Sequence, residues 1–230
     1  MIDITNLTKS YGRARGITDL TLHVPKGSCF GFIGPNGAGK STTIRTLLGL
    51  ISPTAGSARV LGQDCRRDRT AILAQVGYMP SEAMFYPEMR VAEVIRLSAD
   101  LRRRDCRAEA AALCRALDLD PRKKIRELSL GNRKKVSIVC AMQHRPALYV
   151  LDEPTSGLDP LVQRAFWSLV EERRREGATV FLSSHVLYEV QRFCDRAAII
   201  REGRLIAEGT TAELDIENRF FDYYEGRITQ

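Results

Sequence analysis

The sequence lacks the long apolar segments and the leader pattern that mark membrane and secreted proteins. No apolar run approaches the ~20 residues that a membrane-spanning helix needs. The first ten residues, MIDITNLTKS, do not show the basic and then apolar order of a signal peptide. These absences predict a soluble chain that stays in the cytoplasm, where it is made.

The cysteines also lack any pattern of a disulfide framework or a metal site. Six are present, and none forms a C-x-x-C pair or has a histidine at metal-binding spacing; they stand at positions 29, 65, 106, 114, 140 and 194. Scattered single cysteines are typical of reduced, mostly buried side chains in a cytosolic protein. The pattern argues against zinc binding and against thiol catalysis.

The charge balance is basic but carries no long basic tract. The 35 lysines and arginines outnumber the 28 acidic residues, for a formal net charge of +7. A basic surface can bind nucleic acid. Here the basic residues occur in short clusters, such as Arg102–Arg104 and Arg133–Lys135, at predicted helix ends or in loops. We therefore expect solvated faces, some turned toward anionic lipid headgroups, and no nucleic-acid partner.

Short strands alternate with helices along almost the whole chain, which predicts an α/β fold with a largely parallel sheet. The expected strands are Ile2–Leu7, Leu20–Val24, Ser28–Ile33, Ala58–Leu61, Gln75–Met79, Ala147–Leu151, Thr179–Leu182 and Ala197–Ile200. A tight hairpin turn is expected at 201–204. Helical spacing predicts one buried helix face from Leu161, Val162, Ala165, Phe166, Leu169 and Val170.

One segment differs in composition from the rest. From about residue 88 to 145 the chain has almost no β-branched runs and is rich in Ala, Leu and Arg. We interpret it as a helical subdomain inserted into the α/β core of a single domain that spans residues 1–230. Residues 211–230 are expected to form a short C-terminal tail.

A phosphate-binding loop is the most specific motif. The pattern GxxxxGK[ST] is matched by Gly34, Pro35, Asn36, Gly37, Ala38, Gly39, Lys40 and Ser41, and Thr42 follows. An apolar strand leads into the loop, and a helix is expected over Thr42–Leu50. In such a loop the backbone N–H groups face phosphates, Lys40 reaches the β and γ oxygens, and the Ser41 hydroxyl ligates Mg²⁺. A purely structural glycine turn does not explain the lysine and the hydroxyl together, so the chain is expected to bind a nucleoside triphosphate.

Two adjacent acids end a second apolar strand. Asp152 and Glu153 follow Ala147–Leu151, and Pro154 to Asp159 (PTSGLD) come directly after them. Because neighbouring side chains on a strand point in opposite directions, the two acids can divide their roles. Asp152 is expected to hold the Mg²⁺ shell, and Glu153 to activate the water that attacks the γ-phosphate.

With these motifs, the whole chain resembles the ATP-binding subunits of ABC (ATP-binding cassette) transporters. That resemblance implies a P-loop cassette with an N-terminal antiparallel β portion and an inserted helical subdomain. It assigns adenine stacking to Tyr11 and the signature (LSGGQ in the family) to Ser129 and Gly131 within LSLGN. It also assigns the D-loop to Ser156–Asp159 and the switch histidine to His185, which contacts the γ-phosphate.

The sequence departs from the family pattern in two places. The signature has Leu130 and Asn132 where the family has glycine and glutamine. Ser81 occupies the slot of a glutamine that usually ligates Mg²⁺, and whether Ser81 or Glu82 replaces it is left open. These departures and the aromatic segment Phe220–Glu225 are similar to those of cassettes that serve exporters of lipophilic or peptide compounds.

The resemblance implies an ATPase, with ATP and Mg²⁺, that works as a homo- or heterodimer. It would drive a separate membrane-spanning permease from the cytoplasmic face of the membrane, and the apolar loop from Ala83 to Pro87 is expected to dock there. One alternative is a soluble cassette that acts on nucleic acid, but the segment between Lys40 and Ser129 is too short for the coiled coil that some of those carry. The other is a nucleotide-binding regulatory subunit that hydrolyses poorly. Glu153 argues against it, and Ser81 leaves it open.

Overall fold

The computed structural model describes residues 1–12 and 14–227 and contains two β-sheets. The strands are β1 (Ile2–Tyr11), β2 (Ala14–Val24), β3 (Cys29–Ile33), β4 (Ala55–Val60), β5 (Gln63–Asp64), β6 (Val76–Met79), β7 (Leu148–Asp152), β8 (Thr179–Ser184), β9 (Arg196–Arg201) and β10 (Arg204–Thr210). One sheet is antiparallel in the order β2-β1-β4-β5. The other has the order β10-β9-β3-β8-β7-β6, and every neighbouring pair in it is parallel except β10 with β9. The predicted fold class, including the N-terminal antiparallel portion, is confirmed.

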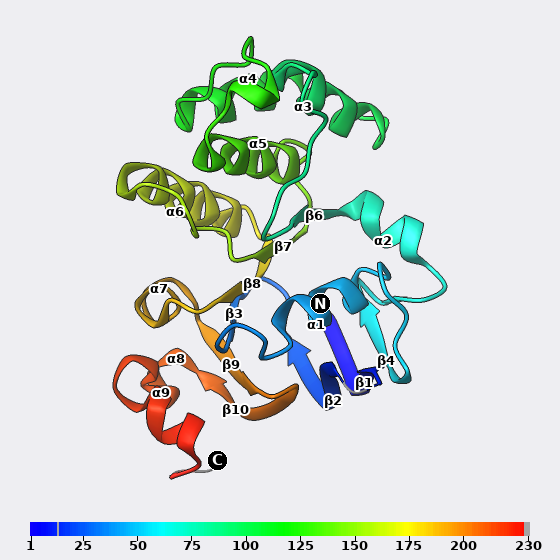
Figure 1. Cartoon of the computed structure of the whole chain (residues 1–230), viewed down its shortest axis with the longest axis vertical. Helices are drawn as coiled ribbons and strands as arrows, with labels where there is room; N and C mark the ends of the chain where they lie inside the picture. Colours follow the sequence, from blue (N-terminus) through cyan, green and yellow to red (C-terminus); the bar gives the residue numbers. More distant parts are fainter. Residues whose placement is uncertain (13, 228–230) are drawn as a thin grey trace.

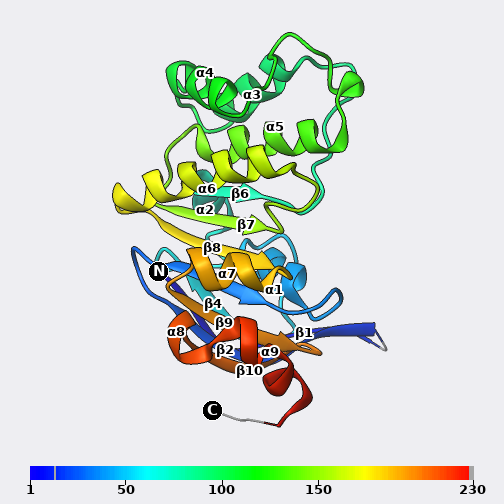
Figure 2. The same ribbon diagram turned by 90° about the vertical axis from the view of Figure 1, so that its left-hand side faces the viewer.

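Helices cover both faces of the six-stranded sheet. They are α1 (Lys40–Leu47), α2 (Arg69–Gln75), α3 (Val91–Asp100), α4 (Arg107–Ala116), the 3₁₀ helix η1 (Ile125–Glu127), α5 (Leu130–Met142), α6 (Pro160–Arg175), α7 (Leu187–Phe193), α8 (Thr211–Leu214) and α9 (Ile216–Glu225). Figure 1 shows α1 beside the antiparallel sheet, and Figure 2 shows α6 and α7 on the other side of the six-stranded sheet. Among the described residues, no helix combines the length and the hydropathy of a membrane span.

The central strands divide their side chains between two hydrophobic cores. Phe30 and Phe32 of β3 face the antiparallel sheet and α1, together with Phe181 of β8. Cys29 and Ile33, from the same strand, face the core formed with α5, α6 and α7. Because side chains alternate along a strand, a strand covered on both faces is apolar throughout, and every residue of β3 is buried.

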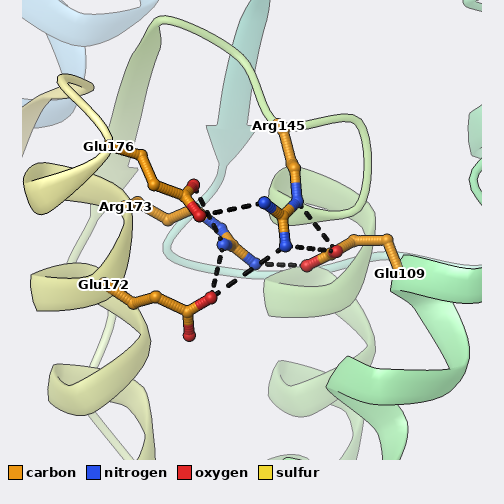
Figure 3. Close-up of polar contacts among 5 residues, drawn as sticks. All are labelled: Glu109, Arg145, Glu172, Arg173 and Glu176. Carbon is orange, nitrogen blue, oxygen red and sulfur yellow. Dashed lines mark hydrogen bonds and ion pairs between the residues drawn. The ribbon is translucent and has the colours of Figure 1, made fainter.

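The helices α3, α4 and α5 lie between β6 and β7 in the sequence and at one end of the molecule (Figure 1). Five charged side chains join this end to α6 (Figure 3). Arg173 of α6, only 2% exposed, is paired with Glu109 of α4 and with Glu172 and Glu176 of its own helix. Arg145, before β7, is paired with Glu109 and Glu176 at 2.8 and 2.9 Å.

All eight expected strands are present, but several boundaries differ. β1 continues to Tyr11, and β2 begins at Ala14. The two strands pair along this extra length, where polar side chains hide the strand pattern in the sequence. The helix expected from Thr42 begins at Lys40 instead. Leu161, expected on a buried face, is 78% exposed at the start of α6. Residues 228–230 of the expected tail lie outside the described residues.

Candidate functional site

The candidate site lies where four neighbouring parallel strands end. β3 leads into the phosphate loop, β7 ends at Asp152, β8 ends at Ser184, and β6 ends two residues before Ser81. The register aligns these ends, because Ile33 pairs with Ser184, Asp152 with Ser183 and Met79 with Leu151. The carboxyl ends of parallel strands are the usual ligand-binding edge of such a sheet.

The phosphate loop requires glycine at two positions for steric reasons. A Cβ on Gly34 would lie 2.5 Å from the Ile200 carbonyl oxygen. Gly39 has φ +109° and precedes the first turn of α1, which contains Lys40, Ser41 and Thr42. The free N–H groups at a helix N-terminus attract anions. The loop geometry therefore fits the phosphate chain of a nucleotide.

The amine of Lys40 is buried at the centre of the site. It is 6% exposed and donates to the carbonyl oxygens of Gly34 at 2.5 Å and Pro35 at 3.3 Å. It also lies 3.1 Å from Oε1 of Glu153. Lys40 thus links the phosphate loop of β3 with the acid that follows β7.

Glu153 is held by contacts to both its side chain and its backbone. Oε2 lies 2.7 Å from Nδ1 of His185, and the backbone N–H donates to Oγ of Ser183 at 3.0 Å. Its φ of +50° is in the left-handed region, which costs a residue with a side chain about 1–3 kcal/mol. The contacts with Lys40 and His185 hold the carboxylate beside the phosphate loop.

A carboxylate oxygen of Asp152 fits a magnesium ion, with Ser41 of the phosphate loop as the second ligand expected from the sequence. Oδ1 of Asp152 accepts a hydrogen bond from Ser183 Oγ at 2.5 Å, while Oδ2 is buried and has no hydrogen-bond partner among the described residues. Mg²⁺ takes one or two protein oxygens together with phosphate and water oxygens. Within the described chain no group of three or more His, Cys, Asp or Glu could hold a metal by itself.

Tyr11 lies on the hairpin next to the phosphate loop. It is 45% exposed and pairs with Ala14 across the hairpin, and the Lys9 amine lies 5.1 Å from the centre of its ring. The same hairpin reaches the loop at Gly39, where a Cβ would lie 3.0 Å from the Ile17 side chain. The ring is partly exposed on the hairpin whose Ile17 contacts the phosphate loop.

The signature residues lie in a different place from the phosphate loop. Ser129 caps α5 by accepting from Asn132 N–H at 3.3 Å, and a Cβ on Gly131 would lie 3.0 Å from the Gly157 carbonyl oxygen. They line a pocket of about 650 Å³ with Gly157 and Asp159, and no residue from 34 to 42 lines it. Asp159 also caps α6, as expected from its position before Pro160. Within one chain, the signature and the D-loop form a surface separate from the phosphate loop.

Four residues at the site were not predicted from the sequence. Ser183 hydrogen-bonds both acids, and the strand register could have revealed it. Lys134 of α5 is buried and donates to the Glu153 carbonyl oxygen; in the sequence it is hidden in a basic cluster. Burial lowers the pKa of Lys134, and the carboxylates of Glu153 and Asp152 oppose that shift. Phe220 and Phe221 of α9 line a pocket of about 300 Å³ with the phosphate loop and His185.

The comparisons with known proteins identify the family. A family model described as "ABC transporter" matches residues 17–156. The bacitracin transport ATP-binding protein BcrA of Bacillus licheniformis is 35% identical over 226 residues, which covers 95% of this chain and 72% of that protein. The chain belongs to the ABC transporter family. As a cassette of that family, it binds and hydrolyses ATP.

Two further matches agree with this assignment of the ABC cassette. The Nod factor export ATP-binding protein I of Paraburkholderia xenovorans is 34% identical over 218 residues, which covers 93% of this chain and 72% of that protein. A solved structure described as the ATP-binding subunit of an ABC transporter has a TM-score of 0.86 and 33% identity, and covers 96% of this chain and 93% of its own. The cassette therefore shares both sequence and fold with transporter ATPase subunits.

Proposed function

We propose that this cassette works as a dimer with Mg²⁺, on the cytoplasmic face of a membrane, and drives a separate permease that exports a lipophilic or peptide compound. The observation that carries the catalytic part is the carboxylate of Glu153, held 3.1 Å from the Lys40 amine and 2.7 Å from His185 Nδ1. The exporter part rests on the relatives, whose names refer to bacitracin transport and Nod factor export.

In this proposal, Glu153 accepts a proton from the water that attacks the γ-phosphorus. The new bond joins the water oxygen to phosphorus, the bond to the β-phosphate oxygen breaks, and ADP and phosphate leave. Lys40 neutralises the β and γ oxygens, and His185 hydrogen-bonds the γ-phosphate. When bound, Mg²⁺ would be held by Ser41 and Asp152 and would stabilise charge on the phosphates.

Dimer formation is supported by the separation of the two nucleotide-facing surfaces. Ser129 and Gly131 line a pocket that contains no phosphate-loop residue. Leu130, which also lines this pocket, is 69% exposed and would be covered in the proposed dimer. A second cassette, of this or another sequence, would place its bound ATP there.

A permease contact is supported by the loop after β6. Met84 is 92% exposed and Tyr86 is 72% exposed, while Phe85 between them packs against the core. Phe85 thus fixes a loop that presents two large apolar side chains. Ser81 follows β6 at the same sheet edge as Asp152, so a contact at this loop lies close in sequence to the nucleotide site. In this proposal, one of Ser81 and Glu82 supplies the oxygen that the glutamine provides in the family pattern.

The deciding experiment is Glu153→Gln. The amide keeps the shape of the carboxylate but cannot accept the proton, so we expect ATP turnover to fall about 100-fold or more, since a general base contributes 10²–10⁴-fold. ATP binding should remain, measured by calorimetry. Glu171→Gln, an exposed carboxylate on α6, is the matched control and should keep the parental rate. Parental turnover in Glu153→Gln would overturn the assignment. An inactive parent that still binds ATP would favour the regulatory-subunit alternative.

A further inference from the structure

Lys134 is a buried cation that the catalytic scheme does not use. It lies in the first turns of α5, is 6% exposed, and its amine is 2.5 Å from the backbone carbonyl oxygen of Glu153. A buried ammonium is costly unless it is paired or hydrogen-bonded, so a position of this kind needs a compensating interaction. For Lys134, this interaction is the hydrogen bond to the backbone carbonyl oxygen of Glu153.

With the contact from Lys134, both the N–H group and the carbonyl oxygen of Glu153 are hydrogen-bonded. Its N–H side is held by Ser183, through Oγ at 3.0 Å and the carbonyl oxygen at 3.2 Å. Its carbonyl side is held by Lys134. With φ at +50°, Glu153 is in a conformation that the backbone does not favour by itself, so hydrogen bonds on both sides are needed to maintain it.

The same helix carries the signature. α5 begins directly after Ser129, and Lys134 follows Gly131 by less than one helical turn, a rise of about 4.5 Å. One helix of 13 residues therefore carries both the signature and Lys134. Through Lys134, this helix contacts the backbone of Glu153.

We propose that Lys134 is a positioning residue for Glu153. By holding the carbonyl oxygen of Glu153, it keeps the left-handed turn in place and the carboxylate aligned on the attacking water. The inference rests on the proposed ATPase mechanism and adds a residue that orients its proton acceptor.

The test compares Lys134→Met with Arg102→Met. Arg102 is the control because it is also a partly buried cation that donates to a backbone carbonyl oxygen, that of Ser98 at 2.9 Å, and it does not line the signature pocket. Steady-state ATP hydrolysis by the full chain is measured across ATP concentrations. We expect kcat to fall about 10–100-fold in Lys134→Met with KM unchanged, since small misplacements of a catalytic group have effects of this size. Arg102→Met should keep the parental kcat.

Two further measurements separate positioning from simple loss of structure. Lys134→Arg, which retains a cationic donor, should recover most of the parental kcat. Binding of a non-hydrolysable ATP analogue should be unchanged in Lys134→Met, while amide hydrogen exchange of residues 153–158 should become faster. If Lys134→Met does not fold, Lys134→Gln replaces it, and its shorter uncharged side chain should lower kcat in the same direction.

The outcomes distinguish this inference from the function on which it rests. Parental kcat in Lys134→Met, together with loss of turnover in Glu153→Gln, overturns the role of Lys134 alone. An equal fall of kcat in Lys134→Met and Arg102→Met shows that Lys134 has only a structural role, and so does a fall that Lys134→Arg does not reverse. Either result also overturns the proposal. Parental turnover in Glu153→Gln overturns the proposed function and this inference together.

Discussion

At the scale of single residues, the site balances buried charges of opposite sign. Lys40 and Lys134 are each 6% exposed, and Asp152 is fully buried. Glu153 lies between them, with its carboxylate toward Lys40 and its carbonyl oxygen toward Lys134. Removing one member of such a set leaves an uncompensated charge, which costs more than the intact interaction contributes. Variants at this site should therefore keep shape where possible and change one charge at a time.

A buried histidine away from the site predicts a pH dependence of stability. His144 is 4% exposed, and burial, together with the charge of Arg102, lowers its pKa to about 4 from an ordinary value of 6.5. Between these two values the unfolded chain binds more protons than the folded chain. Stability from neutral His144 is therefore fully present above pH 6.5 and is lost as the pH falls toward 4. The loss reaches about 3 kcal/mol, from 1.36 kcal/mol per pKa unit.

Urea unfolding between pH 7.5 and 4.5 checks this prediction. His144→Gln cannot gain a proton, so its free energy of unfolding should fall less with pH than that of the parent. His23→Gln is the control, because His23 is exposed and hydrogen-bonds Asp3 at the surface. Equal pH slopes for the parent and His144→Gln would contradict a buried neutral ring.

At the scale of secondary-structure elements, the ion-pair network of Figure 3 joins three segments. Glu109 comes from α4, Arg145 precedes β7, and Glu172, Arg173 and Glu176 belong to α6. Arg173 is the central member, since it contacts all three carboxylates while being 2% exposed. Ion pairs, as well as apolar packing, therefore hold α4 and the segment before β7 against α6.

Arg173→Met should destabilise the fold by about 2–4 kcal/mol. Breaking a buried ion pair costs about 3–5 kcal/mol, and the half-exposed Glu172 and Glu176 reduce that figure through solvent screening. Denaturant unfolding measures the change. Arg175→Met, which removes only the exposed pair with Glu171, should stay within about 0.5 kcal/mol of the parent. Equal free energies of unfolding for Arg173→Met and Arg175→Met would contradict a stabilising role of the network.

The sequence predicted the strands better than the site contacts, for physical reasons. Apolar strands such as β3 and β7 are buried on both faces, so their composition alone reveals them. The hairpin turn expected at 201–204 joins β9 to β10, but β10 was not among the expected strands because its polar residues Arg204, Glu208 and Thr210 interrupt the apolar pattern. The phosphate loop and the two acids follow from local motifs. Lys134 and Ser183 reach Glu153 only through tertiary packing, and nothing local in their sequence shows that contact.

At the scale of the whole molecule, some of the exposed apolar side chains lie at the two proposed contact surfaces. Leu130 lines the signature pocket, and Met84 and Tyr86 are exposed on the loop after β6. The expected docking segment from Ala83 to Pro87 therefore has two outward residues suitable for contact. Phe85 lies against the core and is unsuited to report on a partner.

Cysteines introduced at Met84 or Tyr86 should cross-link to the cytoplasmic loops of the permease. The background should be low, because five of the six native cysteines are buried and Cys140 is partly buried. His23→Cys, on the exposed face of β2, is the control position and should not cross-link. Mass spectrometry of the purified complex identifies the linked peptides. Co-purification of the two proteins without a link at either position would place the docking surface elsewhere.

The left-handed turn at Glu153 has a consequence for the genetics of the transporter. Replacing Glu153 with glycine gives up its ion pair with Lys40 but relieves an unfavourable backbone conformation, so the two effects on folding oppose each other. Under the proposed mechanism this variant would lack the catalytic acid while its abundance stayed nearly unchanged. Inactive copies would then bind ATP and occupy the proposed permease beside intact copies. A defect at this position is therefore expected to be dominant, whereas a defect that unfolds the cassette is recessive.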